Sequence, residues 1–309
     1  MSDALPDYPR ILRELAVEVE PFVGRGEVAA YIPELAKADP NRWGIAVATL
    51  DGQVYQAGEA DARFSIQSVS KLFSLSLAIQ LQGDALWTRV GREPSGDPFN
   101  SLVQLEYEAG IPRNPFINAG ALVITDVIRS HLPDAARAVL DLIHRAAGDD
   151  AARFDEAVAR SESETGHRNR ALGHFMKSFG NLHHDVEEVL DAYFHHCSIT
   201  MSCVDLARAA LFLANRGRSP YTDAEVLSPH DTKYVNSLML TCGTYDAAGD
   251  FAFRVGLPAK SGVGGGLLAV MPGAFAACAW SPGLDKGGNS IAGAKALELL
   301  ARATGLSVF

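Results

Sequence analysis

The sequence predicts an α+β fold, an α/β sandwich with one antiparallel sheet built from both chain ends and a helical lobe inserted between them. Three observations predict it. Strand-like segments occur near residues 43–58 and again at 267–280. Between them, alanine and leucine recur at helical spacing, interrupted by glycine and proline. The length of 309 residues and hydrophobic content of 48% suit one domain with a sizeable core.

The N-terminal part begins with an amphipathic helix over residues 8–22. Its apolar side chains fall on one face: Ile11, Leu12, Leu15 and Val19. A shorter helical piece, broken by Pro33, follows it. Residues 43–49 predict a strand, and Asp51-Gly52 is a hairpin signal before a second strand at Val54. An antiparallel pair therefore leads into the segment around Ser68.

The middle of the chain predicts a run of helices. They cover residues 119–131, 134–147, 151–164, 170–178, 185–197, 202–215 and 229–241. Near the C-terminus, strands at 267–271 and 274–280 are joined by a Pro-Gly turn, and a last helix covers 288–304. We divide the single domain, residues 1–309, into a sheet subdomain of about 1–67 and 242–309 and a helical subdomain of about 68–241.

The segment Ser-Ile-Gln-Ser-Val-Ser-Lys at residues 65–71 carries the first chemical signal. If the apolar helix behind it starts near Ser68, Lys71 lies one turn away on the same face. A lysine amine can then activate the serine hydroxyl, and the free N–H groups of the helix end can hold an oxyanion. The simpler alternative is a serine N-cap with a lysine in the first turn, a position that the helix dipole disfavours.

The bulk properties exclude several classes of function. The net charge is −10 and no Lys/Arg-rich run occurs, so nucleic acid and acidic membranes are poor partners. No apolar run is long enough to span a membrane, and the first ten residues lack the pattern of a secretory signal. The four cysteines form no Cys-x-x-Cys pair and are expected as free, mostly buried thiols. A cytoplasmic protein is expected.

Three further patterns resemble parts of functional sites. The glycines at 262–266 lack a following Gly-Lys-Ser/Thr, so a close backbone approach explains them better than a phosphate loop. The pairs His183-His184 and His195-His196 have no spacing of a usual metal site, and we expect them to be solvated or capping residues. Lys260-Ser261-Gly262, at the end of an expected strand, can offer N–H groups to an oxyanion.

Several long blocks together resemble the bacterial serine-dependent glutaminases. These blocks are Tyr31–Ala36, Phe64–Lys71, Gly91–Ser101, Gly110–Ala121, Met176–Asn181 and Pro258–Gly266. A Ser-x-x-Lys followed by a Lys-Ser-Gly strand is also the order found in serine β-lactamases and penicillin-binding proteins. The resemblance covers about residues 24–309. It implies a serine β-lactamase-like fold and hydrolysis of L-glutamine to L-glutamate and ammonia, with no metal and no organic cofactor.

The resemblance also implies a role for individual residues. Ser68 is the nucleophile and Lys71 its activating partner, while Tyr245 assists proton transfer and Tyr31 is a second active-site tyrosine. The N–H groups of Ser68 and Val263 form the oxyanion hole. The amino-acid end of glutamine is held by Asn118, Glu162, Asn169 and Tyr193. A homodimer or homotetramer is expected on the same basis.

Two alternatives stay open. One is another serine hydrolase of the β-lactamase-like fold, acting on peptidoglycan-type substrates. The other is a non-catalytic ligand-binding relative that kept the fold. Intact Ser68, Lys71 and Tyr245 favour catalysis, and the resemblance favours glutamine as the substrate.

Overall fold

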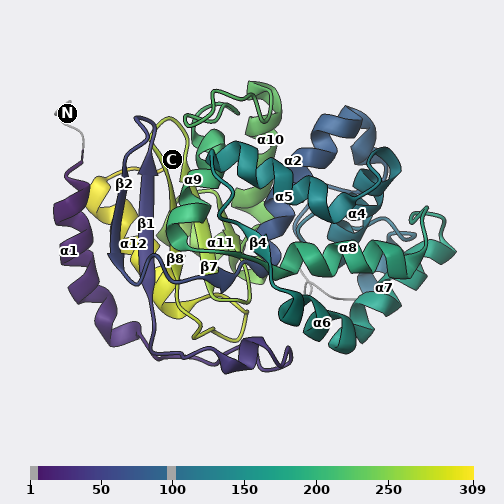
Figure 1. The fold of residues 1–309 in the computed structure, drawn as a ribbon, viewed down its shortest axis with the longest axis horizontal. Coiled ribbons are helices and arrows are strands. Elements are labelled where there is room, and N and C mark those ends of the chain that lie inside the picture. The colour runs from purple at the N-terminus through teal and green to yellow at the C-terminus, as the bar shows by residue number, and fades with distance from the viewer. Residues whose placement is uncertain (1–5, 96–101) are drawn as a thin grey trace.

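The computed structural model describes residues 6–95 and 102–309 and contains a five-stranded antiparallel sheet in the order β2-β1-β8-β7-β6. The strands are β1 (Gly44–Thr49), β2 (Val54–Gly58), β6 (Ala259–Ser261), β7 (Gly266–Met271) and β8 (Phe275–Trp280). β1 pairs with β8, and Ala46 lies opposite Cys278. The two ends of the chain thus meet within one sheet, which confirms the predicted architecture (Figure 1).

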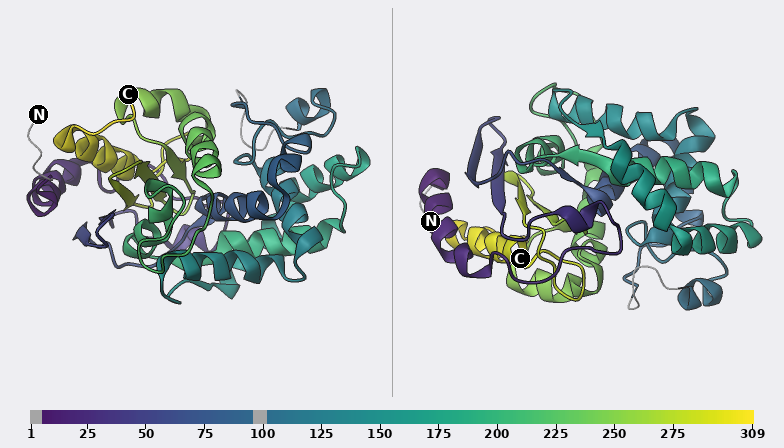
Figure 2. Two further views of the ribbon diagram at one scale, coloured as in Figure 1. Left: turned by 90° about the horizontal axis from the view of Figure 1, so that it is seen from above. Right: turned by 60° about the horizontal axis from the view of Figure 1, so that its bottom comes forward.

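Two helices cover one face of this sheet. They are α1 (Tyr8–Val19) and α12 (Ile291–Thr304), which lie together at one side of the molecule (Figure 2). The predicted apolar stripe of α1 is buried there with alternate strand residues such as Ile45 and Val47. This alternation follows from the two-residue period of a strand, which sends neighbouring side chains to opposite faces.

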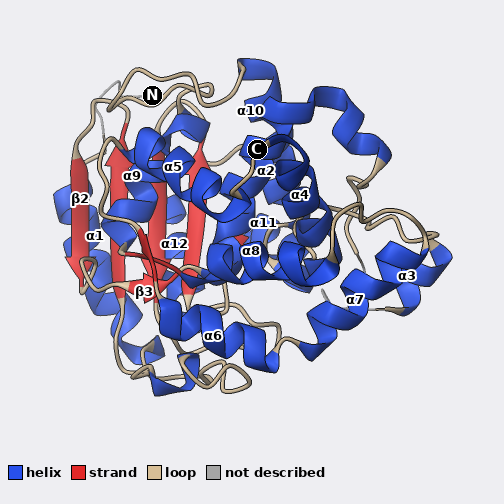
Figure 3. Cartoon of the chain, turned by 45° about the vertical axis from the view of Figure 1, so that its right-hand side comes forward, coloured by secondary structure: helices blue, strands red, loops and turns tan. Residues whose placement is uncertain are grey.

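The opposite face of the sheet is covered by α9 (Cys203–Ala214), which lies against β1 and β8 (Figure 3). Ala46 and Ala48 of β1 join the same core as α9, with the lobe helices behind it. α9 belongs to the stretch 68–241 that the sequence assigns to the helical subdomain, yet it packs on the sheet. The predicted division into two subdomains stays a prediction.

The lobe is built around α2 (Ser70–Gln82), in which every residue from 70 to 79 is buried. The remaining helices are α3 (Val103–Tyr107), α4 (Asn118–His131), α5 (Ala135–Ala147), α6 (Glu156–Thr165), α7 (His167–Ser178), α8 (Val186–Ser198), α10 (Pro229–Cys242) and α11 (Ala248–Arg254). Of these, α4, α5, α8 and α10 contact α2. A small second sheet joins β3 (Phe64–Ser65), β5 (Ile199–Met201) and β4 (Arg153–Phe154).

Most predicted elements lie within a few residues of their observed bounds. The expected helix 151–164 instead starts with strand β4 and becomes helical only at Glu156. The expected helical piece around Pro33 is a series of turns with one 3-10 turn, Leu35–Lys37, because proline blocks a regular helix there. Within the described ranges, no helix combines the length and the apolar character that crossing a membrane requires.

Candidate active site

Ser68 lies in a 3-10 helix, Gln67–Val69, that leads directly into α2. Gln67 has a φ of 50°, an uncommon conformation for a residue with a side chain. The β6–β7 turn approaches this corner closely: a Cβ atom at Gly262 would lie 2.5 Å from the carbonyl oxygen of Ile66, and one at Gly264 would lie 2.1 Å from that of Ser65. The two glycines therefore allow the strand end to approach the serine.

Lys71 lies in the first turn of α2 and is fully buried. Its Nζ donates to Oδ1 of Asn118 at 2.6 Å and to the carbonyl oxygen of Phe116 at 3.2 Å. Burial lowers the pKa of Lys71 to about 8, although Cys197 and Glu162 act in the opposite direction. At pH 7, about one molecule in ten then carries a neutral amine that can accept a proton.

Tyr245 approaches the same point from the turn after α10. Its hydroxyl interacts with Ser68 and lies 3.4 Å from the carbonyl oxygen of Ser261. Its φ is 56°, which again is uncommon for a residue with a side chain. Burial raises the pKa of Tyr245, so the phenol keeps its proton and can donate it.

A second buried lysine supports this tyrosine. The Nζ of Lys260 lies 4.9 Å from the centre of the Tyr245 ring and donates to the carbonyl oxygens of Ser261, at 2.6 Å, and Gly243, at 3.2 Å. Burial and the nearby Lys71 lower the pKa of Lys260 well below its usual value. Lys260 joins β6 to the turn that carries Tyr245.

One cavity of about 220 Å³ brings together the predicted site residues. Its lining includes Tyr31, Ser68, Asn118, Glu162, Asn169, Tyr193, Tyr245 and Val263. Lys71 joins them through its hydrogen bond to Asn118. The cavity lies between the helix ends of the lobe and the β6–β7 turn, so residues far apart in the sequence share one space.

Polar side chains from three helices form one wall of the cavity. Asn118 is the first residue of α4, and its Nδ2 donates to Oδ1 of Asn169, in the first turn of α7, at 3.0 Å. The hydroxyl of Tyr193, from α8, donates to Oδ1 of Asn118 at 3.3 Å. These contacts orient amide and phenol groups toward one space, as a site for a polar ligand requires.

Glu162 supplies the carboxylate of this wall. It lies on α6 and is buried, with burial raising its pKa to about 7, while a hydrogen bond with Gln67 and the nearby Lys71 lower it. A bound cation would favour the ionised carboxylate. The site therefore offers an acidic group to a positively charged ligand atom.

Tyr31 lies at the mouth of the cavity and is 60% exposed. Its turn is held to the sheet side by the paired backbone of Glu27 and Leu284. On the lobe side, the backbone N–H of Glu34 donates to the hydroxyl of Ser161 at 3.3 Å. This tyrosine thus borders the opening, and its phenol lies within electrostatic range of Tyr245 and Glu162.

Sequence reasoning missed other lining residues, among them Gln67, Arg168 and Cys197. Gln67 and Arg168 each stand next to a predicted residue, which was the only available signal. Cys197 gave none, because buried thiols are common in cores. Its pKa is raised by burial and by Glu162. All four cysteines are free and buried.

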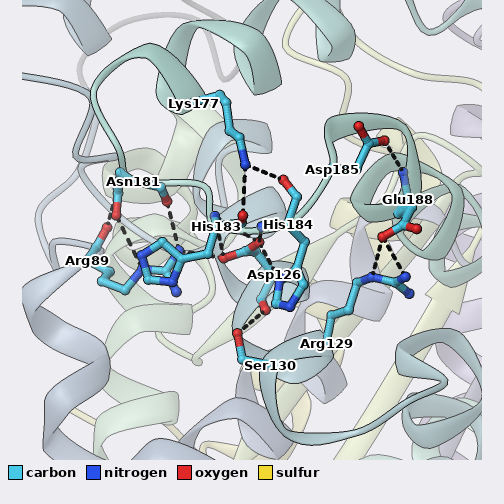
Figure 4. Close-up of polar contacts among 10 residues, drawn as sticks. All are labelled: Arg89, Asp126, Arg129, Ser130, Lys177, Asn181, His183, His184, Asp185 and Glu188. Atoms are coloured by element: carbon cyan, nitrogen blue, oxygen red, sulfur yellow. Dashed lines mark hydrogen bonds and ion pairs between the residues drawn. The ribbon is translucent and has the colours of Figure 1, made fainter.

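The four paired histidines differ in their surroundings. His196 is buried, its Nε2 lies 3.0 Å from the carbonyl oxygen of Ala135, and burial lowers its pKa to about 4, so the prediction of a solvated or capping residue is wrong for it. His184 is half-buried and contacts Asp126 with Nδ1 at 2.9 Å (Figure 4). Within residues 6–95 and 102–309, no cluster of three His, Cys, Asp or Glu side chains could hold a metal ion.

Comparison with known proteins places this geometry in one family. The sequence model of the glutaminase family matches residues 26–309. A glutaminase of Paraburkholderia phytofirmans is 56% identical over 303 residues, covering 98% of this chain and 100% of the relative. A glutaminase of Ralstonia nicotianae is also 56% identical, with the same coverage of both chains.

Solved structures agree with this comparison. A probable glutaminase superposes with a TM-score of 0.91 at 36% identity, covering 97% of this chain and 98% of its own. The probable glutaminase of Bacillus subtilis complexed with 6-diazo-5-oxo-L-norleucine superposes with a TM-score of 0.89 at 33% identity, covering 100% and 99% of the two chains. The similarity extends over sheet and lobe alike.

Proposed function

The chain belongs to the glutaminase family, and on that premise we propose that it hydrolyses the side-chain amide of L-glutamine to L-glutamate and ammonia through an acyl-serine. One observation carries the mechanism. Ser68 and Tyr245 interact within a cavity whose lining also includes Glu162, Asn118 and Asn169. A hydroxyl nucleophile and groups complementary to an amino acid therefore share one space.

Acylation begins with the neutral form of Lys71, which takes the proton of the Ser68 hydroxyl. The serine oxygen bonds to the amide carbon, and the N–H groups of Ser68 and Val263 hold the oxyanion. The carbon–nitrogen bond then breaks as Tyr245 delivers a proton to the nitrogen, and ammonia is released. The proton taken by Lys71 returns to Tyr245, so the serine hydroxyl proton in effect ends on ammonia.

Deacylation repeats the sequence with water. Neutral Lys71 accepts a proton from the water, whose oxygen bonds to the acyl carbon. The bond from this carbon to the Ser68 oxygen breaks, and the serine regains its proton. L-glutamate forms, and the enzyme returns to its starting state with every proton accounted for.

The polar wall orients the substrate. The carboxylate of Glu162 meets the α-ammonium group of glutamine, and Asn169, Tyr193 and Tyr31 meet its carboxylate. Asn118 contacts both Lys71 and Asn169 and so links the base to the substrate wall. An analogue without either charged group leaves buried polar atoms unpaired, and the site rejects it.

The cellular setting completes the proposal. We propose a cytoplasmic protein that assembles as a homodimer or homotetramer. Four free, buried thiols, Cys197, Cys203, Cys242 and Cys278, suit a reducing compartment. The mass of the purified protein by light scattering, at several concentrations, tests the assembly.

The test is ammonia release from millimolar L-glutamine by the purified protein. Ser68→Ala should lower kcat by roughly 10³-fold or more. Ser70→Ala is the matched control, since it removes a buried hydroxyl without a hydrogen-bond partner two residues away. Absence of ammonia release by folded wild-type protein overturns the proposal.

Two further assays separate the alternatives. Hydrolysis of the chromogenic cephalosporin nitrocefin by the wild-type protein would favour another hydrolase of the same fold. Stabilisation by glutamine without turnover of either compound would favour a ligand-binding relative. The three readouts use one preparation and are mutually distinguishable.

A further inference from the structure

A second cavity, larger than the first, lies next to the site. It measures about 520 Å³, and most of its lining is apolar. Phe116 and Ile117 contribute from the segment before α4, Leu240 from α10, and Gly249 and Ala252 from α11. Tyr245 lines both cavities. The tyrosine that interacts with Ser68 is therefore a common wall between them.

The rest of the common wall is the segment 116–118. Phe116 and Ile117 line the larger cavity, and Asn118 lines the smaller one. The Nζ of Lys71 contacts this segment at the Phe116 carbonyl and the Asn118 side chain, at 3.2 and 2.6 Å. The groups that move protons thus lie between the two spaces.

The acyl-enzyme creates a transport problem. While the glutamyl group is bonded to Ser68, its amino-acid end occupies the cavity of about 220 Å³ between Glu162 and Asn169. Ammonia must nevertheless leave, and water must reach the acyl carbon. Both are small neutral molecules, and both are needed beside Tyr245, which faces the larger cavity.

We propose that the larger cavity is the passage through which ammonia leaves and hydrolytic water enters while the acyl group fills the smaller one; this rests on the proposed glutaminase activity. The passage changes no bond itself. Acylation releases NH₃ beside Tyr245, and deacylation consumes one water molecule that arrives by the same way. L-glutamine and L-glutamate use the opposite opening, beside Tyr31.

The passage can be narrowed from α11. A Cβ atom added at Gly249 meets no atom within 4 Å, so this position accepts a larger side chain. Ala252 lies three residues further on the same helix and shares the face. Gly249→Phe and Ala252→Phe should each fill part of the cavity. Gly249→Ala is the matched control, because a methyl group leaves most of the space open.

Three measurements define the expected result. In both phenylalanine variants, kcat for glutamine falls about tenfold, while the affinity for L-glutamate stays within about twofold of wild type. Hydroxylamine, which competes with water for the acyl-enzyme, reports the size of the passage. Because it is larger than water, the ratio of γ-glutamyl hydroxamate to glutamate should fall in the two variants and stay unchanged in Gly249→Ala.

Two outcomes overturn the inference. One is a wild-type kcat and a wild-type hydroxamate ratio in every phenylalanine variant that folds, whether one or both. The other is a loss of kcat in parallel with glutamate affinity at an unchanged ratio, which would indicate a displaced Tyr245. A wild-type protein without ammonia release would instead refute the glutaminase activity itself, so the two failures are distinguishable.

Discussion

The amine of Lys71 lies 2.6 Å from the side-chain oxygen of Asn118; the lysine is fully buried, whereas the half-buried asparagine lines the cavity. Through this contact the base is joined to the wall that is proposed to bind the substrate. Burial disfavours the charged form of the Lys71 amine and lowers its pKa to about 8.

Lys71→Met should separate stability from activity. The lowering of the Lys71 pKa from 10.5 to about 8 corresponds to about 3 kcal/mol of lost stability when the amine is charged. Removing the amine regains this but takes one donor from the Asn118 oxygen, which keeps the Tyr193 hydroxyl, and one from the Phe116 carbonyl oxygen, at a cost of about 1–2 kcal/mol. We expect a net gain of about 1 kcal/mol at pH 7 in urea unfolding, with kcat reduced by about 10³-fold or more.

The stability gained by Lys71→Met should depend on pH, and the lowered pKa of Lys71 sets the direction of the change. The penalty of the wild-type amine is complete below the folded pKa of about 8 and disappears as pH rises toward 10.5. The advantage of Lys71→Met should therefore shrink between pH 8 and 10.5. Lys37→Met, at an exposed lysine paired with Glu34, should show no such trend. A variant less stable than wild type at every pH would contradict the prediction.

Asn118→Asp should move the pH profile of activity. A carboxylate placed 2.6 Å from Nζ favours the charged amine and raises the pKa of Lys71. Since the neutral amine accepts the proton, the rise of kcat with pH should shift upward by about one pH unit or more. Asn169→Asp is the control, because Asn169 contacts Asn118 and has no hydrogen bond to Lys71. Equal shifts in both variants would contradict the role of the direct contact.

Asp126 is the centre of a buried network that holds the lobe together (Figure 4). Its carboxylate accepts from Arg89 at 2.6 Å, from the backbone N–H groups of His183 and His184, and contacts the His184 ring. These partners outweigh burial and lower its pKa. Asp126→Asn leaves Arg89 buried without its counter-charge, so we expect a loss of about 3–5 kcal/mol in urea unfolding.

The control for this network lies close by on the same helix. Arg129 forms an ion pair of 2.6 Å with Glu188, whose side chain is 53% exposed. Arg129→Gln should change the free energy of unfolding by less than about 1 kcal/mol, because solvent screens such pairs. A similar loss of unfolding free energy in both variants would show that burial does not strengthen the contacts of Asp126.

Part of this site could be predicted from local pattern and part could not. Ser68 and Lys71 are about one helical turn apart, so spacing alone predicts that both side chains lie on the same side of the helix. Glu162 and Asn118 stand at helix ends more than forty residues apart, where composition cannot distinguish a ligand from a cap, and only the resemblance indicated them. The short strand Phe64–Ser65 is too brief to show any periodicity.

Glu162 should make glutamine binding depend on pH. Its pKa is about 7 without ligand because burial opposes its charge, and the α-ammonium group of glutamine needs the ionised carboxylate. KM should therefore fall as pH rises from 6 to 8, with most of the change near pH 7. Glu162→Gln should raise KM at pH 8 about tenfold or more and should abolish this part of the pH dependence.

The effect of Lys71 on kcat must be measured separately from the effect of Glu162 on binding. Deprotonation of Lys71 raises kcat over a neighbouring pH range, since its pKa is about 8. Inhibition by L-glutamate at each pH isolates binding, because it involves no proton transfer to the amine. Glutamate affinity should rise with pH in wild type and in Lys71→Met, but stay level in Glu162→Gln. A glutamate affinity that does not change with pH in wild type would contradict the prediction, because it would show that Glu162 is already ionised at pH 6.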